Sequence, residues 1–288
     1  MRGLIIKGIG GFYYVLTDHG IIQTKGRGIL KNKKITLAVG DFVNMEILDD
    51  GDGVINSIEP RRNHFLRPPI ANVDCFVVVL SATKPKPNFS IIDKFLIMAE
   101  MNDTEAIVCV NKCDLVTQEE KEEILSIYGE IYDTIFVSGK TGVGLDQLEN
   151  HISGKKVAFA GPSGVGKSTI INRLIPEAMM ETGEVSDKTK RGKHTTRHVE
   201  IFQLESGGMI FDTPGFTSFE ILEAEEDDLM EYYPDIAKYK GMCKYDNCRH
   251  LKEPECKVIE AVTQGKIHQM RYSSYVANME EIRNKKKY

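Results

Sequence analysis

The sequence predicts an α/β protein in three parts: a small β-barrel, a doubly wound parallel sheet and a mostly helical, metal-binding segment. Three observations predict this arrangement. Residues 1–68 hold short apolar runs separated by turn residues, residues 69–218 alternate apolar runs with helix-like stretches, and a cysteine and histidine cluster follows residue 240. We expect the domain boundaries at 1–68, 69–218 and 219–288.

The composition is that of a protein without membrane spans. The chain has 288 residues, 41% of them hydrophobic, and a formal net charge of −5. No run approaches the ~20 apolar residues of a membrane helix, and the charged start does not resemble a signal peptide. We therefore expect a cytoplasmic protein with no membrane partner. The sequence carries no oligomerisation signal, so a monomer is the expected state.

The first part predicts a barrel of short strands. Glycine and aspartate turns separate five candidates, at residues 4–8, 12–17, 21–24, 41–48 and 53–58. Five short strands in so short a segment fit an OB-fold barrel, with a small sandwich or an SH3-like barrel as the alternative. Residues 61–72 contain Arg67-Pro68-Pro69 and are predicted to be a linker.

Charge is distributed unevenly in this first part. Residues 1–40 carry seven basic side chains against one acidic one. Because barrel loops of this type bind oligonucleotides, the basic loop is predicted to contact RNA, with a solvated basic loop as the alternative. The candidate contacts are Lys25, Arg27, Lys31, Lys33 and Lys34.

Strands and helices alternate along the central part. Strands are predicted at 73–80, 105–111, 134–138 and 157–160, and a hairpin at 198–204 and 208–211. Helices are predicted at 91–101, 119–128, 145–151 and from 167 onward. Helical spacing also continues through 257–282, beyond an acidic run at 220–235.

A phosphate-binding loop lies between a predicted strand and a predicted helix. The pattern G-x-x-x-x-G-K-S lets backbone N–H groups point at phosphate oxygens at a helix N-terminus. Its lysine neutralises phosphates and its serine ligates Mg²⁺. The predicted nucleotide-binding residues here are Gly161, Pro162, Ser163, Gly164, Val165, Gly166, Lys167, Ser168 and Thr169.

A guanine-selecting motif follows another strand. Asn111-Lys112-x-Asp114 ends the apolar run 106–110, at the strand end where such sheets bind ligands. A carboxylate at Asp114 can accept both the ring N–H and the exocyclic amine of guanine, a donor pair that adenine lacks. Ser138, Gly139 and Lys140 follow the next strand and are predicted to back the base, although alone they also fit an ordinary polar turn.

The order of these motifs is reversed from that of an ordinary GTPase, in which the phosphate loop comes first. The sequence therefore predicts a circularly permuted P-loop GTPase domain. Asp212-Thr-Pro-Gly215 follows the phosphate loop as a D-x-x-G motif, with Asp212 expected to hold Mg²⁺ through a water and Gly215 to contact the γ-phosphate. Either Thr195 or Thr196 is expected to complete the Mg²⁺ site together with Ser168.

The residue that orients water in many GTPases is replaced here. Phe216 follows Gly215, where a glutamine would position the attacking water. Hydrolysis by the isolated protein is therefore expected to be slow. The sequence does not identify the group that takes the place of the glutamine. His194 and His198 are candidates, with exposed loop histidines as the alternative for each.

A cysteine and histidine cluster predicts a structural zinc site. Cys243, Cys248, His250 and Cys256 offer three sulfurs and one imidazole within one short stretch of the chain. That ligand set suits one tetrahedral Zn²⁺ with no open position. Unliganded thiols are the alternative, because a disulfide would need an oxidising compartment.

The combined motifs resemble the ribosome small-subunit-dependent GTPase A family, RsgA. The resemblance covers nearly the whole chain and includes N-K-C-D, S-G-K, G-P-S-G-V-G-K-S, G-K-H-T-T, D-T-P-G and the zinc segment. It implies an N-terminal OB-fold, a permuted GTPase domain and a C-terminal zinc-binding domain. It also implies hydrolysis of GTP to GDP and phosphate, stimulated by the small ribosomal subunit, in late maturation of that subunit.

Two other functions remain open at this point. Phe216 is compatible with a non-enzymatic RNA-binding scaffold that uses GTP only as a ligand. A permuted GTPase could also act on the large subunit or on another RNA. The resemblance favours the small subunit and its ribosomal RNA as partners, with GTP and GDP as ligands.

Overall fold

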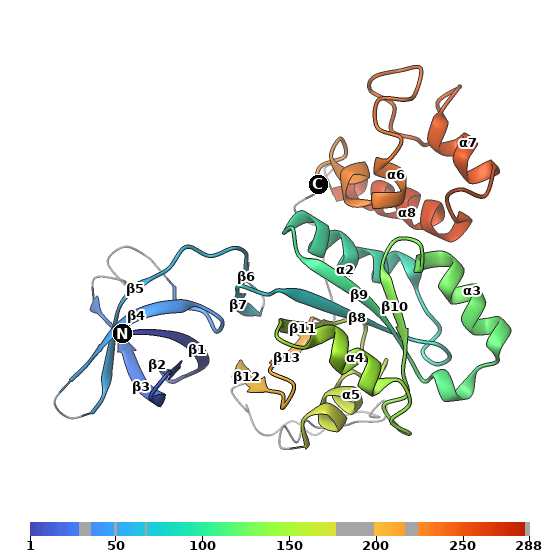
Figure 1. Cartoon of the computed structure of the whole chain (residues 1–288). Helices are drawn as coiled ribbons and strands as arrows, with labels where there is room; N and C mark the ends of the chain where they lie inside the picture. The colour runs from blue at the N-terminus through green and yellow to red at the C-terminus, as the bar shows by residue number, and fades with distance from the viewer. Residues whose placement is uncertain (29–35, 49–50, 67, 177–198, 217–223, 286–288) are drawn as a thin grey trace, which may run out of the picture.

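The computed structural model describes residues 1–28, 36–48, 51–66, 68–176, 199–216 and 224–285. Figure 1 shows a barrel at the N-terminus, a central sheet with helices on its faces, and a helical C-terminal part above the helix α2. This arrangement agrees with the predicted fold class, an α/β protein in which a central sheet lies between an OB-like barrel and a helical part with a Cys3His cluster that could bind zinc.

Five strands form the barrel, as predicted. They are β1 (Arg2–Ile9), β2 (Phe12–Thr17), β3 (Gly20–Gly26), β4 (Phe42–Ile47) and β5 (Gly53–Ile58). The order β1-β2-β3-β5-β4 is closed by pairing of β1 with β4. Alternate residues point inward, so Ile5, Val15, Val43 and Ile55 are fully buried in its core.

The segment predicted to be a linker is instead an ordered hairpin. The strands β6 (His64–Leu66) and β7 (Pro69–Ala71) pair with each other, and Phe65 and Ile70 between them are buried. Proline is tolerated here because a two-stranded sheet has only edge strands, where a missing N–H need not break a ladder. The prolines mark the connection between two short strands. The prediction of a linker was wrong for residues 64–66 and 69–71, which form these strands.

The central sheet has the topology expected of a doubly wound fold. Its strand order is β10-β9-β8-β11-β13-β12, parallel except for β12. The bounds are β8 (Cys75–Ser81), β9 (Glu105–Asn111), β10 (Asp133–Phe136), β11 (Lys156–Ala160), β12 (Glu200–Gln203) and β13 (Met209–Phe216). Every residue of β8 is buried, as expected of a parallel strand covered on both faces.

Helices cover both faces of this sheet. They are α2 (Phe89–Met101), α3 (Gln118–Tyr128), α4 (Leu145–Ile152) and α5 (Lys167–Leu174). One buried cluster joins α2 and α3 to the sheet and continues into the barrel core, and a second joins α4 and α5 to the other face. Thr117 and Glu120 form a capping box that fixes the start of α3.

In the C-terminal part, the single helical stretch predicted at residues 257–282 is divided into two helices, α7 and α8. The elements are η3 (Leu229–Tyr232), α6 (Pro234–Ala237), α7 (Lys257–Thr263) and α8 (Gln269–Lys285). Gly265 separates α7 from α8 with a φ of 71°, a left-handed conformation that glycine adopts without strain. None of the helices in the described ranges is both long and apolar enough to cross a membrane.

Candidate nucleotide and metal sites

The phosphate loop lies where β11 gives way to α5, at the carboxyl edge of the sheet. Gly161 has a φ of 133°, and a Cβ there would collide with the carbonyl oxygen of Val79 on the neighbouring strand β8. Only glycine fits so close a backbone approach. The loop from Pro162 to Gly166 then leads into the N-terminus of α5, where backbone N–H groups are free to face an anion.

Lys167 occupies the inside of this loop. Its Nζ donates to the carbonyl oxygens of Gly161 at 2.6 Å and of Pro162 at 2.9 Å. Burial lowers the pKa of the Lys167 ammonium to about 8. Ser168 and Thr169 follow on the first turn of α5 and are half-buried.

Asn111 joins the base motif to the phosphate loop. Its Nδ2 donates to the carbonyl oxygen of Val165 at 2.8 Å, and its Oδ1 accepts from the N–H of Gly139 at 3.0 Å. A Cβ on Gly166, which has a φ of 97°, would collide with that Nδ2. One buried amide therefore holds three of the predicted motifs together.

Lys112, also in the base motif, contacts the phosphate loop. Its Nζ donates to the carbonyl oxygen of Gly164 at 3.2 Å and also to that of Lys84. The segment after β8 therefore lies beside the phosphate loop, and this placement was not predicted from the sequence. Asp114 is exposed on the short turn η1 (Cys113–Leu115), which the N–H of Cys113 fastens to the carbonyl oxygen of Val137.

Of the residues after β10, Ser138 and Gly139 are buried, and Gly139 lies against α5. Ser138 is buried, and its hydroxyl accepts from the N–H of Thr141 at 3.1 Å. A Cβ on Gly139 would lie 3.2 Å from a side-chain carbon of Thr169. Lys140 is exposed. Gly139 therefore contacts both the base motif, through Asn111, and the end of the phosphate loop, through Thr169.

Asp212 lies on β13, the strand next to β11. Its Cα partner across the β12–β13 ladder is Glu200. Burial raises the pKa of the Asp212 carboxyl, and the negative charge of Glu200 raises it further. The sequence predicted that β13 would end at Asp212, but the strand continues to Phe216, which pairs with Ala160 after a register shift.

Several predicted residues lie outside the described ranges. These are the Mg²⁺ candidates Thr195 and Thr196, the catalytic candidates His194 and His198, and the RNA candidates Lys31, Lys33 and Lys34. The backbone of Gly215 belongs to β13. The two remaining RNA candidates already have partners within the barrel. The Nζ of Lys25 makes a cation–π contact 4.5 Å from the ring centre of Phe12, and Arg27 pairs with Glu46 at 2.9 Å.

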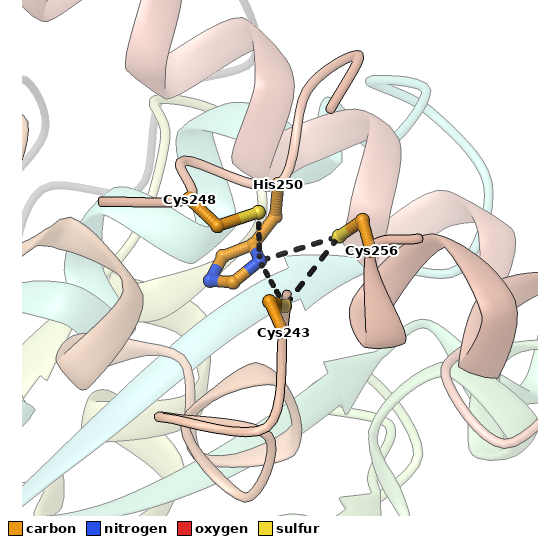
Figure 2. Close-up of side chains that lie close together, drawn as sticks. All are labelled: Cys243, Cys248, His250 and Cys256. Carbon is orange, nitrogen blue, oxygen red and sulfur yellow. Dashed lines mark hydrogen bonds between the residues drawn. The ribbon is translucent and has the colours of Figure 1, made fainter. Parts of the chain in front are cut away.

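The four predicted metal ligands converge on one point (Figure 2). Nδ1 of His250 lies 3.5 Å from the Sγ of Cys243 and 3.4 Å from those of Cys248 and Cys256. A tetrahedral Zn²⁺ with ordinary bond lengths would hold sulfur and nitrogen ligands about 3.5 Å apart. The ligand atoms all lie within 4.8 Å of one another, so these four residues could hold one zinc ion.

Hydrogen bonds hold the loop that presents these ligands. The hydroxyls of Tyr272 and Tyr275, both on α8, donate to the carbonyl oxygens of His250 and Arg249 at 2.9 Å. The carboxylate of Glu253 accepts from three backbone N–H groups between residues 249 and 252. His250 has a φ of 60°, and these bonds offset the strain of that conformation.

A buried arginine that was not predicted fixes the metal-binding part to the helix α2. Arg271 on α8 pairs with Asp93 on α2 at 2.5 Å and with Asp235 on α6 at 2.9 Å. Lys94 on α2 also pairs with Glu281 on α8 at 2.5 Å. Sequence spacing gives no sign that α2 meets α8, because the two helices lie far apart in the chain.

Comparisons with known proteins match this architecture. The RsgA GTPase family matches residues 58–222, and the RsgA N-terminal domain family matches residues 2–55. The chain is 44% identical to a protein of Alkaliphilus metalliredigens named small ribosomal subunit biogenesis GTPase RsgA, covering 100% of this chain and 99% of that one. A protein of the same name from Clostridium beijerinckii is 46% identical over 98% of this chain and 97% of its own.

Two solved structures share the whole fold. The crystal structure of YjeQ from Thermotoga maritima matches with a TM-score of 0.85 and 33% identity, over 98% of both chains. That of YloQ, described as a circularly permuted GTPase, matches with a TM-score of 0.82 and 39% identity, over 99% of this chain and 95% of the other.

Proposed function

This chain belongs to the RsgA family of circularly permuted GTPases and hydrolyses GTP, and from that premise we propose that it binds the small ribosomal subunit and acts in its late maturation. The observation that carries the proposal is the Asn111 link between the base motif and the phosphate loop. It supports guanine nucleotide binding, and the curated relatives named for small-subunit biogenesis supply the partner.

We assign the nucleotide roles to the residues gathered at the carboxyl edge of the sheet. Asp114 accepts the guanine N–H groups, with the stem of Lys112 and the segment Ser138–Lys140 against the base. The loop Gly161–Thr169 and Lys167 hold the phosphates. Ser168, Asp212 through a water, and Thr195 or Thr196 hold Mg²⁺, which offsets the charge that develops on the phosphates during hydrolysis.

The group that completes catalysis is proposed to act only on the subunit. Phe216 has no polar atom with which to orient water, so the isolated chain has low activity. His194 and His198 stay candidates for the completing group. Stimulation of turnover by the subunit follows from this incomplete site.

The two flanking parts are proposed to contact the ribosome, with boundaries at residues 68 and 218. The barrel contacts ribosomal RNA through Lys25 and Arg27 and through Lys31, Lys33 and Lys34. Arg271 fixes the zinc-binding part on α2. We propose that this part forms a second contact surface for the ribosome, in a fixed position relative to the GTPase domain. A monomer in the cytoplasm is part of the same proposal.

Neutralising two described basic residues of the barrel tests the RNA contact. Replacing Lys25 and Arg27 with glutamine is expected to lower affinity for the small subunit about tenfold and the logarithmic salt slope by about 2, since fewer phosphates are neutralised. The measurement is subunit binding across a salt series. A control that replaces Lys121 and Lys155, both outside the barrel, should leave the slope unchanged, and equal slopes in both variants would disprove the contact.

A further inference from the structure

The barrel forms a continuous sheet with the hairpin that carries Asp212. Strand β1 pairs antiparallel with β12 at Lys7 and Glu200, and β12 pairs with β13 at Glu200 and Asp212. Figure 1 shows β12 on the side of the central sheet that faces the barrel. Lys7, Glu200 and Asp212 therefore stand in one row across three strands, with Glu200 in the middle.

Residues directly opposite each other in an antiparallel ladder project to the same face, with Cβ atoms about 5 Å apart. Glu200 and Asp212 thus place two carboxylates side by side, an unfavourable pairing. Lys7 offsets it, because its Nζ lies 2.6 Å from Oε2 of Glu200. Both of these side chains are mostly covered, with exposed fractions of 30% and 29%. The ion pair is therefore less screened than one on the open surface.

A second barrel contact reaches the residue before Asp212. Gly40 has a φ of 95° and lies against Phe211, which is fully buried on β13. A Cβ on Gly40 would lie 2.9 Å from the ring of Phe211 and would collide with the carbonyl oxygen of Ala71. Phe211 and Asp212 point to opposite faces of the sheet. The barrel thus contacts β13 directly at Phe211, and on the opposite face it reaches Asp212 through Glu200 of β12.

We propose that Lys7 and Glu200 are positioning residues for the nucleotide site: their ion pair docks the barrel on β12 and holds Asp212 in the geometry that favours GTP over GDP. This inference rests on the proposed role of Asp212. Because coupling between two sites is reciprocal, GTP bound at the phosphate loop also favours the docked barrel. The barrel and the nucleotide site then influence each other through the strand β12.

Two single substitutions separate positioning from a simple effect of charge. Lys7→Met removes a positive charge and Glu200→Gln removes a negative one. If the ion pair positions Asp212, both variants lose it, and each lowers the ratio of GTP to GDP affinity about fivefold. The double variant then loses no more than either single variant, and Lys7→Arg retains the wild-type ratio. The measurement is titration with fluorescent GTP and GDP analogues over a Mg²⁺ series.

A through-space effect on Mg²⁺ would instead shift the half-saturating Mg²⁺ concentration in opposite directions for the two variants, and that result would overturn the proposal. An unchanged affinity ratio would overturn it as well. Lys155→Met is the matched control, because Lys155 forms a 2.6 Å pair with Glu105 of similar exposure, away from the barrel. Failure of the wild-type protein to bind GTP would count against the proposed function, whereas normal wild-type binding with unaffected variants would count against this inference alone.

Hydrogen exchange supplies a readout independent of affinity. The backbone amides of residues 4–9 and 200–203 should exchange more slowly with a GTP analogue than with GDP in the wild-type chain. In Lys7→Met this difference should disappear. Equal exchange of the wild-type chain in both nucleotide states would show that the barrel does not respond to the nucleotide.

Discussion

Replacing Asp114 with asparagine is expected to weaken GTP binding about 100-fold and to create binding of xanthosine triphosphate. Asp114 is exposed at the end of β9, on the short turn Cys113–Leu115. An asparagine amine would face the amine of guanine, donor against donor, and two charge-assisted hydrogen bonds would be lost, worth about 3 kcal/mol together. Xanthine carries a carbonyl oxygen at that position, which accepts from the new amine.

Titration with GTP and xanthosine triphosphate measures both effects. Asp133→Asn is a suitable control, because Asp133 is also exposed but begins β10, at the opposite edge of the sheet. It should bind GTP as the unchanged protein does. An Asp114→Asn variant that kept its preference for GTP would mean that the base lies elsewhere.

Replacing Cys256 with serine is expected to abolish zinc binding and to destabilise the C-terminal part by about 4 kcal/mol or more. The sulfur of Cys256 lies 3.9 Å from that of Cys243 and 3.4 Å from the His250 nitrogen. Without the metal, the loop keeps its hydrogen bonds to Tyr272 and Tyr275 and the ion pairs of Arg249, but it loses the bonds that tie its two ends together. A chelator should give the same result as the substitution.

Metal analysis and thermal unfolding test this prediction together. Cys75→Ala provides the control, because Cys75 is buried in β8 and takes no part in the cluster. That variant should retain one zinc ion per chain. Its free energy of unfolding should fall only by the small amount that the new cavity costs. If Cys256→Ser retained zinc and its unfolding temperature, the four residues would not form the metal site.

The local patterns of the sequence predicted most of the central sheet. Strand β9 spans residues 105–111 as expected, because a buried parallel strand is a continuous apolar run with clear ends. Helix α5 begins at Lys167 because the phosphate-loop pattern itself specifies a strand, a turn and a helix. The four zinc ligands were also predictable, since they lie close to one another in the chain.

Contacts between distant parts of the chain could not be predicted in this way. Lys7 and Glu200 lie in different parts of the sequence, and each alone resembles an ordinary surface charge. Arg271 is similar, because nothing around it in the sequence distinguishes a buried arginine from an exposed one. The residues that connect the three parts of the molecule therefore became apparent only from the fold, whereas the candidate ligand-binding residues could be predicted from local motifs.

The measurement that tests the account most directly is GTP hydrolysis by the purified protein, alone and with small or large ribosomal subunits added. We expect a low rate for the protein alone, because Phe216 cannot orient water, and a rise of about tenfold or more with the small subunit only. A rate that neither subunit changes, or that both raise equally, would contradict the proposal that the small subunit completes this active site.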